Sequence, residues 1–198
     1  MPLIPVTMPT PAILCAVALA AWLFIAAWTD VRTRRIPNLL VANGILWGLA
    51  VHTIAPHGEG LFAFWWGGLG AWQALLGLAA GLALFMPLYL LRAVGAGDVK
   101  LLAMVGVWLG PEMLLGATLL TLLSGGVMAI VVMLASRSSR QVLTNVRVML
   151  TTAMVGVHAG KLTPFDAPPS TGVRLPYALA IGVGTLAQVG WVLAHAGP

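Results

Sequence analysis

The sequence has very little charge. Only 8% of its 198 residues are Asp, Glu, Lys or Arg, whereas 60% are hydrophobic. Soluble domains carry about a quarter charged residues, so this composition excludes an ordinary soluble domain. Apolar runs long enough to cross a bilayer recur along the whole chain. We therefore expect residues 1–198 to form a single all-α membrane domain of several packed helices.

Cysteine is almost absent as well. The single cysteine, Cys15, excludes a cysteine-ligated zinc module, which needs about four ligands at recognisable spacing. We interpret Cys15 as a small packing or lipid-facing residue. His52, His57 and His195 have no ligand-like spacing, so we assign no metal and expect no cofactor. No basic segment precedes the first apolar run, which is therefore expected to remain as a helix rather than act as a secretory signal.

Six membrane spans are predicted from the apolar runs. They cover residues 11–28, 37–55, 71–91, 98–109, 113–135 and 175–194. Pro37 suits the first turn of the second span, because it lacks an N–H that would go unbonded there. The connection 56–70, rich in glycine and tryptophan, is typical of an interfacial loop with an aromatic anchor.

The basic residues fall on one side of this topology. With six spans, all ten Lys and Arg lie in the connections after the first, third and fifth spans or, for Lys100, in the first turn of the span that follows. The positive-inside rule then predicts that this side is cytoplasmic and that both termini, with a tail over 1–10, are external. The net charge of +5 is explained by topology, so we expect no nucleic-acid partner.

Residues 136–174 are expected to form a cytoplasmic interfacial segment and loop. Arg140 and Arg147 stand about two turns apart among apolar residues, which fits a helix lying on the inner interface. We hypothesise that this segment flanks a cleft and helps to admit a substrate. His158 and Asp166 in this stretch are interpreted as ordinary surface residues.

Acids are scarcer than bases. Only five are present, and two of them, Asp30 and Asp98, lie at span ends on the predicted cytoplasmic side. Asp98 stands in the stretch AVGAGDVKLLAMVG, after Gly95 and Gly97 and before Lys100. Residues 99–109 give only about 17 Å of helix, against a hydrocarbon core of about 30 Å. We therefore expect the glycine loop and Asp98 to dip below the membrane surface, where irregular backbone must line a wet cavity or be buried in protein.

Two carboxylates in one place suggest acid–base chemistry. They cannot both be ionised at low cost, so one keeps its proton and serves as a general acid beside a general base. A water molecule held between them can attack a peptide carbonyl. The glycines would let a substrate backbone approach closely, and Lys100 would bias the titration of the pair or attract an acidic group of the substrate. Intramembrane acids serve proton relays and ion paths equally well, so a small transporter or proton-conducting protein is the main alternative. A non-catalytic assembly factor is a third interpretation.

Structural interpretations of the same residues also stay open at this point. Asp98 could cap the helix that follows it, and Asp30 could pair with Arg32 or Arg34 at the interface. Lys100 could be a topology determinant that extends to the interface, and the glycines could be plain turn formers. Topology alone does not decide between these roles and a catalytic one.

Three motifs resemble a known family. The sequence "GAGDVK" (residues 95–100) resembles the G-x-G-D-x-K motif of the type IV prepilin peptidases, which are membrane aspartic proteases. The sequence "DVRTRRIPN" (residues 30–38) is similar to their other signature, an aspartate followed by I-P-N. The sequence "LPYALAI" (residues 175–181) is similar to the element that opens their last helix. A bare G-x-G-D would be weak, but three motifs in order on one predicted face are specific.

The resemblance implies that Asp30 and Asp98 form a catalytic dyad. Gly95, Gly97 and Lys100 would support it. The substrate would be a prepilin with a basic leader in the cytoplasm and an apolar helix in the membrane, cut at the boundary between them.

The two other motifs supply candidate substrate-binding residues. These are Pro37, Asn38, Pro176 and Tyr177.

The resemblance is to a short form of the family. Larger members carry a cytoplasmic domain with a cysteine tetrad and also N-methylate the new terminus, whereas here no cysteine pairs exist, so we do not expect methyltransferase activity. The short form resembles the peptidases of tight-adherence (Flp) pilus systems and, more distantly, archaeal preflagellin peptidases. This implies a multi-pass protein of a bacterial inner membrane with its active site facing the cytoplasm, and pilus-assembly proteins as further partners.

Overall fold

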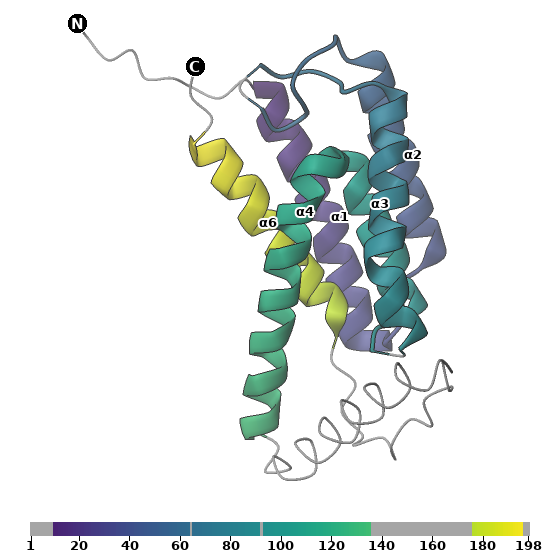
Figure 1. Cartoon of the computed structure of the whole chain (residues 1–198), viewed down its shortest axis with the longest axis vertical. Coiled ribbons are helices and arrows are strands. Elements are labelled where there is room, and N and C mark those ends of the chain that lie inside the picture. Colours follow the sequence, from purple (N-terminus) through teal and green to yellow (C-terminus); the bar gives the residue numbers. More distant parts are fainter. Residues whose placement is uncertain (1–9, 64, 92, 136–175, 196–198) are drawn as a thin grey trace, which may run out of the picture.

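The described part of the protein is built from helices. The computed structural model describes residues 10–63, 65–91, 93–135 and 176–195. In these ranges the helices are α1 (Thr10–Thr33), α2 (Asn38–Ile54), α3 (Ala71–Leu90), α4 (Ala96–Ala135) and α6 (Tyr177–His195) (Figure 1). Two isolated bridges, within the connection 55–70, are the only strand-like pairing in these ranges. The prediction of an all-α fold is confirmed for the described residues.

Four of the helices, α1, α3, α4 and α6, are long and apolar enough to cross a membrane. Helix α2, with 17 residues, is a shorter apolar helix. The start of α1 and the end of α6 lie at the same end of the bundle (Figure 1), which is the relation that an even number of crossings requires. The number of six spans and the side on which the termini lie stay predictions.

A break divides α4 into two helical segments. Gly110 has φ 72° and ψ 171°, a conformation that glycine adopts without steric cost, and Pro111 follows it and has no backbone N–H to donate. The two segments run in roughly opposite directions, so α4 is a helical hairpin (Figure 1). The break lies where the sequence predicts the end of the fourth span.

The first segment of α4 is the centre of the bundle. Every residue from Leu101 to Gly110 is buried. A helix that is apolar on all sides belongs in the interior of a helical assembly, and α4 packs against α2, α3 and α6. The helix that carries Asp98 is therefore held by neighbours on several sides.

Glycines allow α3 to approach this central segment closely. A Cβ atom added at Gly77 of α3 would overlap the carbonyl oxygen of Gly106 in α4, and one added at Gly106 would overlap the carbonyl oxygen of Gly77. Small residues at such crossings let membrane helices pack backbone against backbone. The pair fixes the position of α4 against α3.

The break in α4 is also held by polar contacts from α2. Nδ1 of His52 accepts a hydrogen bond from the backbone N–H of Leu69 over 3.1 Å. The proton of the ring is therefore on Nε2, which lies 3.3 Å from the carbonyl oxygen of Trp108 and donates to it. The indole N–H of Trp108 donates in turn to the carbonyl oxygen of Gly44 over 2.8 Å. His52 is 1% exposed, so this network joins α2, the connection before α3 and α4 inside the protein.

Two helix boundaries differ from the sequence prediction. Helix α1 continues past its predicted end at Trp28 to Thr33, so Asp30 lies inside the last turns of the helix instead of after it. Helix α2 begins at Asn38, and Pro37 is its extended N-cap residue with φ −62° and ψ 127°, instead of a residue of the first turn. In both places polar residues near a helix end made the boundary hard to locate.

The connection between α2 and α3 folds back onto the bundle. Leu61 and Phe62 are each 1% exposed and belong to the hydrophobic core, whereas Trp65 is 63% exposed. The exposed indole agrees with a loop that carries an aromatic group at its surface. Its position at a membrane interface stays a prediction.

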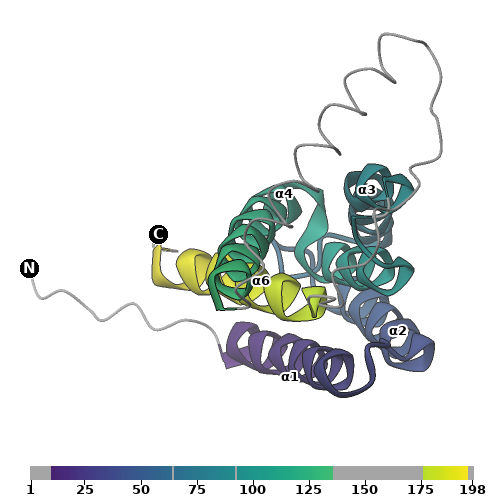
Figure 2. The ribbon, with the colours of Figure 1, turned by 90° about the horizontal axis from the view of Figure 1, so that it is seen from below.

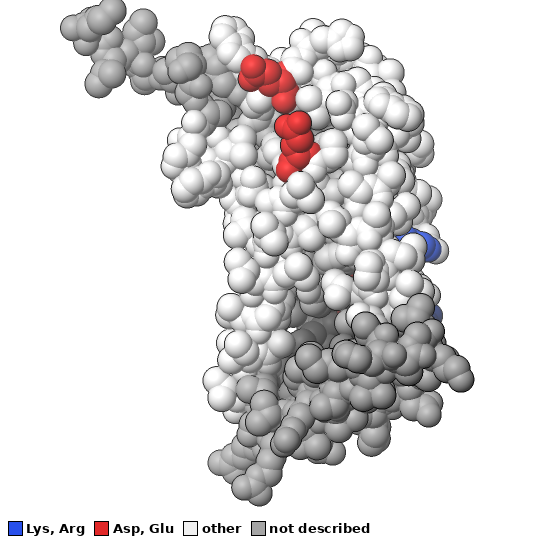
Figure 3. Space-filling model, in the orientation of Figure 1, with Lys and Arg blue, Asp and Glu red and all other residues white. Residues whose placement is uncertain are grey.

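The surface charges visible on one face of the bundle are unevenly distributed (Figure 3). On the face drawn in Figure 3, the acidic side chains gather toward the end that holds the α2–α3 connection, and the basic ones lie further toward the opposite end. At that opposite end α1 ends with Arg32 and Thr33, Arg34 and Arg35 follow it, and α4 begins close to Lys100. This agrees with the one-sided distribution of bases predicted from the sequence.

Candidate active site

Asp30 lies in the last turns of α1 and is buried, with 9% of its surface exposed. Its Oδ2 accepts a hydrogen bond from the backbone N–H of Ala178 over 3.3 Å. Ala178 is the second residue of α6, where backbone N–H groups have no partner within the helix. The positive end of the α6 dipole therefore points toward the Asp30 carboxylate.

Asp98 is the third residue of α4 and is equally buried, at 9% exposed. Its Oδ2 accepts a hydrogen bond from the backbone N–H of Gly95 over 2.9 Å. A side chain that reaches back in this way to the residue preceding the helix forms half of a capping box. Asp98 thus does cap its own helix, as one interpretation of the sequence had it, and the contact also fixes the orientation of its carboxylate.

The two carboxyl groups lie at one end of the bundle, near the end of α1 and the start of α4. They are close enough to interact electrostatically, and α1 and α4 are in contact. Seen from below, α6 lies between α1 and α4 (Figure 2), and the backbone N–H of Ala178 at its start donates to the Asp30 carboxylate. Two acids from segments far apart in the sequence therefore lie at the same end of the bundle, and their action as a dyad stays a prediction.

The arginines next to Asp30 have different partners. The guanidinium of Arg32 lies 4.2 Å from the ring centre of Trp28, so it forms a cation–π contact. Arg34 interacts electrostatically with Asp30, and its backbone N–H donates to the carbonyl oxygen of Asp30 over 2.9 Å. Arg34 also ends α1 in the left-handed region, with φ 55°. An interfacial partner for Asp30 is therefore present, but the Asp30 side chain is buried and directed toward α6.

Tyr177 opens α6 next to the pair of acids. Its ring packs edge-on against Phe85 with 5.9 Å between ring centroids, and it interacts electrostatically with Asp98. Pro176 precedes it, and its carbonyl oxygen accepts a hydrogen bond from the N–H of Leu179 over 3.1 Å. Both residues thus lie at the site, and their role in binding substrate stays a prediction.

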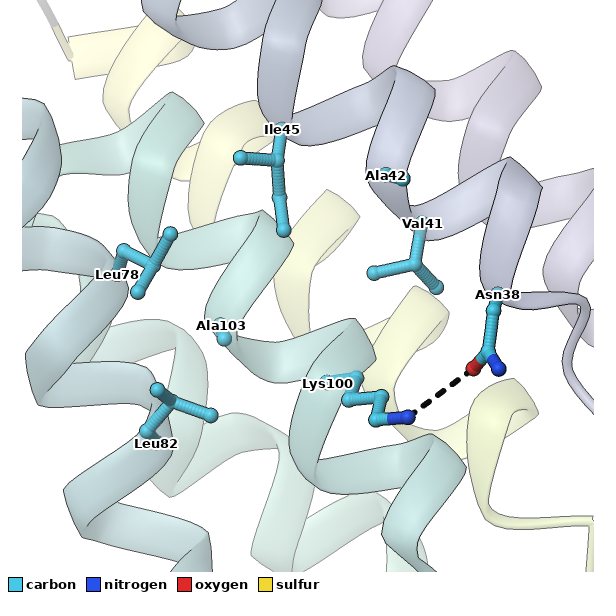
Figure 4. A pocket seen from close by; sticks show the side chains of 8 residues that line it. All are labelled: Asn38, Val41, Ala42, Ile45, Leu78, Leu82, Lys100 and Ala103. Carbon is cyan, nitrogen blue, oxygen red and sulfur yellow. Dashed lines mark hydrogen bonds between the residues drawn. The ribbon is translucent and has the colours of Figure 1, made fainter.

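The remaining candidates form the outer part of the same end. Gly97 faces Ile36, since a Cβ atom added there would lie 3.4 Å from that side chain. The ammonium group of Lys100 donates to Oδ1 of Asn38 over 3.1 Å (Figure 4). Residues two apart in a helix point in different directions, so Lys100 is turned toward α2 while Asp98 is turned toward α1 and α6. A role for Lys100 in tuning the acids stays a prediction, as do the roles of Pro37 and Asn38.

Two features were not found from the sequence, one at this site and one at the break in α4. The backbone N–H of Ala178 has no side-chain signature, although the motif around residues 176–181 indicated that the start of the last helix matters. The network of His52 was also missed, and a histidine inside an otherwise apolar helix was the available signal. The described residues contain no group of three or more His, Cys, Asp or Glu that could hold a metal ion. His158 and Asp166, and the whole segment 136–174, lie outside the described residues.

Comparison with known proteins gives two matches. The sequence model of the type IV leader peptidase family matches residues 17–130. The curated protein "Prepilin leader peptidase/N-methyltransferase" of Bacillus subtilis (strain 168) is 32% identical over 132 residues, which cover 64% of this chain and 47% of that protein. The chain spans about half the length of this curated relative. No solved structure matches the chain significantly.

Proposed function

Because the chain belongs to the type IV leader peptidase family and is a multi-pass membrane protein with several apolar spans, we propose that it is an aspartic endopeptidase that removes the basic leader peptide from type IV prepilins. The single observation that supports this most is that Asp30 and Asp98 lie at the same end of the bundle, close enough to interact electrostatically. Both are buried, they interact electrostatically, and each is oriented through Oδ2 by a backbone N–H at the start of a helix.

The proposed chemistry follows from this arrangement. Two neighbouring carboxylates share a proton, because ionising both in one place is costly. The ionised member takes a proton from a water molecule held between them, and the resulting hydroxide attacks the scissile carbonyl. The protonated member gives its proton to the carbonyl oxygen, which leaves a tetrahedral intermediate. The member that took the proton from water then passes it to the amine nitrogen as the C–N bond breaks, and the other member recovers a proton from a hydroxyl of the intermediate. The backbone N–H groups of Gly95 and Ala178 keep the carboxylates in place during these transfers.

The proposed type of substrate is based on two surroundings of this site, one apolar and one basic. Exposed apolar side chains cover much of the helix surfaces, and basic residues lie at the end of α1 and near the start of α4. We propose that the apolar helix of the prepilin lies against the bundle, that its leader leaves toward the cytoplasm, and that the bond cut lies at the boundary. We further propose the inner membrane of a bacterium as the location, an Flp-like prepilin as the substrate, and pilus-assembly proteins as further partners.

The proposal covers peptidase activity alone. The name of the curated relative also includes N-methyltransferase, but the cysteine tetrad that marks the larger members cannot form in a chain with one cysteine. Mass spectrometry of the processed pilin measures this directly. A mature N-terminus that carries an added methyl group, in a host without another such enzyme, would contradict this part of the proposal.

Co-expression with a candidate prepilin tests the peptidase. The Asp30→Ala and Asp98→Ala variants should each lose leader removal, as should Asp30→Asn and Asp98→Asn, which keep the size of the side chain. General acid–base catalysis contributes about 10²–10⁴-fold, so processing should fall at least to that extent. Glu112→Gln, an exposed acid just after the break in α4, is the matched control and should process normally. Normal processing by either aspartate variant would remove that residue from the dyad, and acid-dependent flux into liposomes without peptide would favour a transporter instead.

A further inference from the structure

A second feature of the protein lies on the other side of the central helix from the two acids. A cavity of about 250 Å³ is formed by α2, α3 and the first segment of α4 (Figure 4). Its walls are apolar side chains, among them Val41 of α2 and Leu82 of α3. Its polar lining residues are Asn38 and Lys100, which are hydrogen-bonded to each other at one end. This cavity, called the groove below, is therefore lined by apolar side chains and has a cation, Lys100, at one end.

Among the described residues, the ammonium group at this end of the groove uses one of its three hydrogen-bond donors. The ammonium group of Lys100 donates one hydrogen bond to a neutral acceptor, Oδ1 of Asn38, and forms no salt bridge with an acid among the residues that the structure describes. An ammonium group has three donors, and the amide nitrogen of Asn38 adds two more next to it. Arg34 and Arg35 lie four and three residues before Asn38 in the chain. This end of the groove therefore offers hydrogen-bond donors and positive charge to an anion.

We propose that this groove binds one anionic phospholipid, with its phosphate at Lys100 and Asn38 and one acyl chain between α2, α3 and α4. Basic pockets between membrane helices bind anionic lipid headgroups by this combination of charge and apolar surface. The orientation fits, since Asn38 begins α2 and Lys100 lies near the start of α4, at the same end of the bundle as the arginines. The inference does not depend on the proposed peptidase activity.

The walls of the groove suit a single acyl chain. Its apolar lining comes from three helices, so a chain lying in it would contact Val41 of α2, Leu82 of α3 and Ala103 of α4. Ala42 and Ala103 keep the groove open, because their side chains are the smallest of its lining residues.

Native mass spectrometry of the full-length protein in detergent tests the proposal. The probes are phosphatidylglycerol and phosphatidylcholine with identical acyl chains, and inorganic phosphate alone. The wild type should retain phosphatidylglycerol in preference to phosphatidylcholine and should not retain inorganic phosphate. One basic group near an anionic lipid contributes about five-fold in affinity, so Lys100→Gln should lower phosphatidylglycerol retention by about that factor, and Lys100→Arg should restore it.

Two further variants separate the groove from general surface charge. Ala42→Phe should block the groove and reduce retention while leaving every charge in place. Arg32→Gln removes a base from the same end of the bundle that stacks on Trp28 and does not line the groove, so it should leave the preference unchanged. Equal retention by wild type, Lys100→Gln and Ala42→Phe would overturn the proposal. So would a result in which Lys100→Gln leaves phosphatidylglycerol binding intact but weakens binding of a prepilin leader peptide, because the occupant would then be the substrate.

Discussion

The backbone N–H of Ala178 donates a hydrogen bond to Oδ2 of Asp30 over 3.3 Å, across 148 residues of sequence. Gly95 holds Asp98 in the same manner, by its N–H and over 2.9 Å. Both donors lie at helix starts, where N–H groups lack partners within the helix. The acids thus come from α1 and α4, while α6, which contributes no acid, orients one of them. This arrangement leads to the first of three predictions about single residues.

The hydrogen bond from Gly95 can be removed without removing any side chain. Gly95→Pro deletes the N–H that orients Asp98, whereas Gly95→Ala keeps it. Hydrogen bonds to charged groups contribute about 1.5–3 kcal/mol, so we expect prepilin processing by Gly95→Pro to fall about ten- to hundred-fold. The rate of leader removal from a reconstituted prepilin measures the effect.

Gly95→Ala is the matched control for this comparison. Gly95 has no left-handed φ, and an added Cβ atom would lie 3.3 Å from Oδ2 of Asp98. A shift of a few tenths of an ångström accommodates that contact, so activity should stay near that of the wild type. Equal rates for the proline and alanine variants would show that the N–H of Gly95 does not matter for the reaction.

The contact between α3 and α4 should be sensitive to a single methyl group. Gly77→Ala or Gly106→Ala forces two backbones apart, and overpacking of this kind costs about 1–3 kcal/mol. Since the single cysteine, Cys15, is buried, a thiol-reactive dye reports unfolding during a thermal ramp, and both variants should unfold at lower temperature. Gly126→Ala is the control, because an added Cβ atom there meets nothing within 4 Å. It should be neutral or stabilising by about 0.5–1 kcal/mol through helix propensity; a similar loss in all three variants would contradict the close approach.

The network around His52 should stabilise the fold. His52→Leu keeps the apolar bulk but leaves the N–H of Leu69 and the carbonyl of Trp108 without partners. Each buried unpaired group costs about 1–3 kcal/mol, so the variant should unfold well below the wild type in the same dye measurement. His57→Leu changes an exposed histidine in the neighbouring connection and should have little effect. If both histidine variants unfold at the wild-type temperature, the network contributes nothing to stability.

Much of the architecture could be predicted because apolar runs and helix-breaking residues carry strong local signals. The break at Gly110 and Pro111 is one example, and the common end of the bundle for Asp30 and Asp98 followed from counting basic residues on each side. The extension of α1 to Thr33 could not be predicted in this way, because polar residues continue the helix after the apolar run has ended.

The direction of side chains and the partners of backbone groups were harder to predict. Lys100 follows Asp98 closely in sequence, but its position on the helix turns it toward Asn38. Ala178 acts through its backbone, which every residue has, so its identity gives no clue to its contact with Asp30. Only the packing of α6 against α1 reveals it.

The position of α6 has a consequence for how small this protein could become. The range matched by the family model ends at residue 130, whereas α6 begins at Tyr177. A protein truncated at residue 130 would still contain both acids. Asp30 would, however, lose the hydrogen bond from the backbone N–H of Ala178 and the packing of α6 against α1. The smallest fragment that keeps the site complete must therefore extend beyond residue 130 and include α6. If the chain is cut between α4 and α6, we expect the site to be restored only when the fragment that carries α6 is produced in the same membrane.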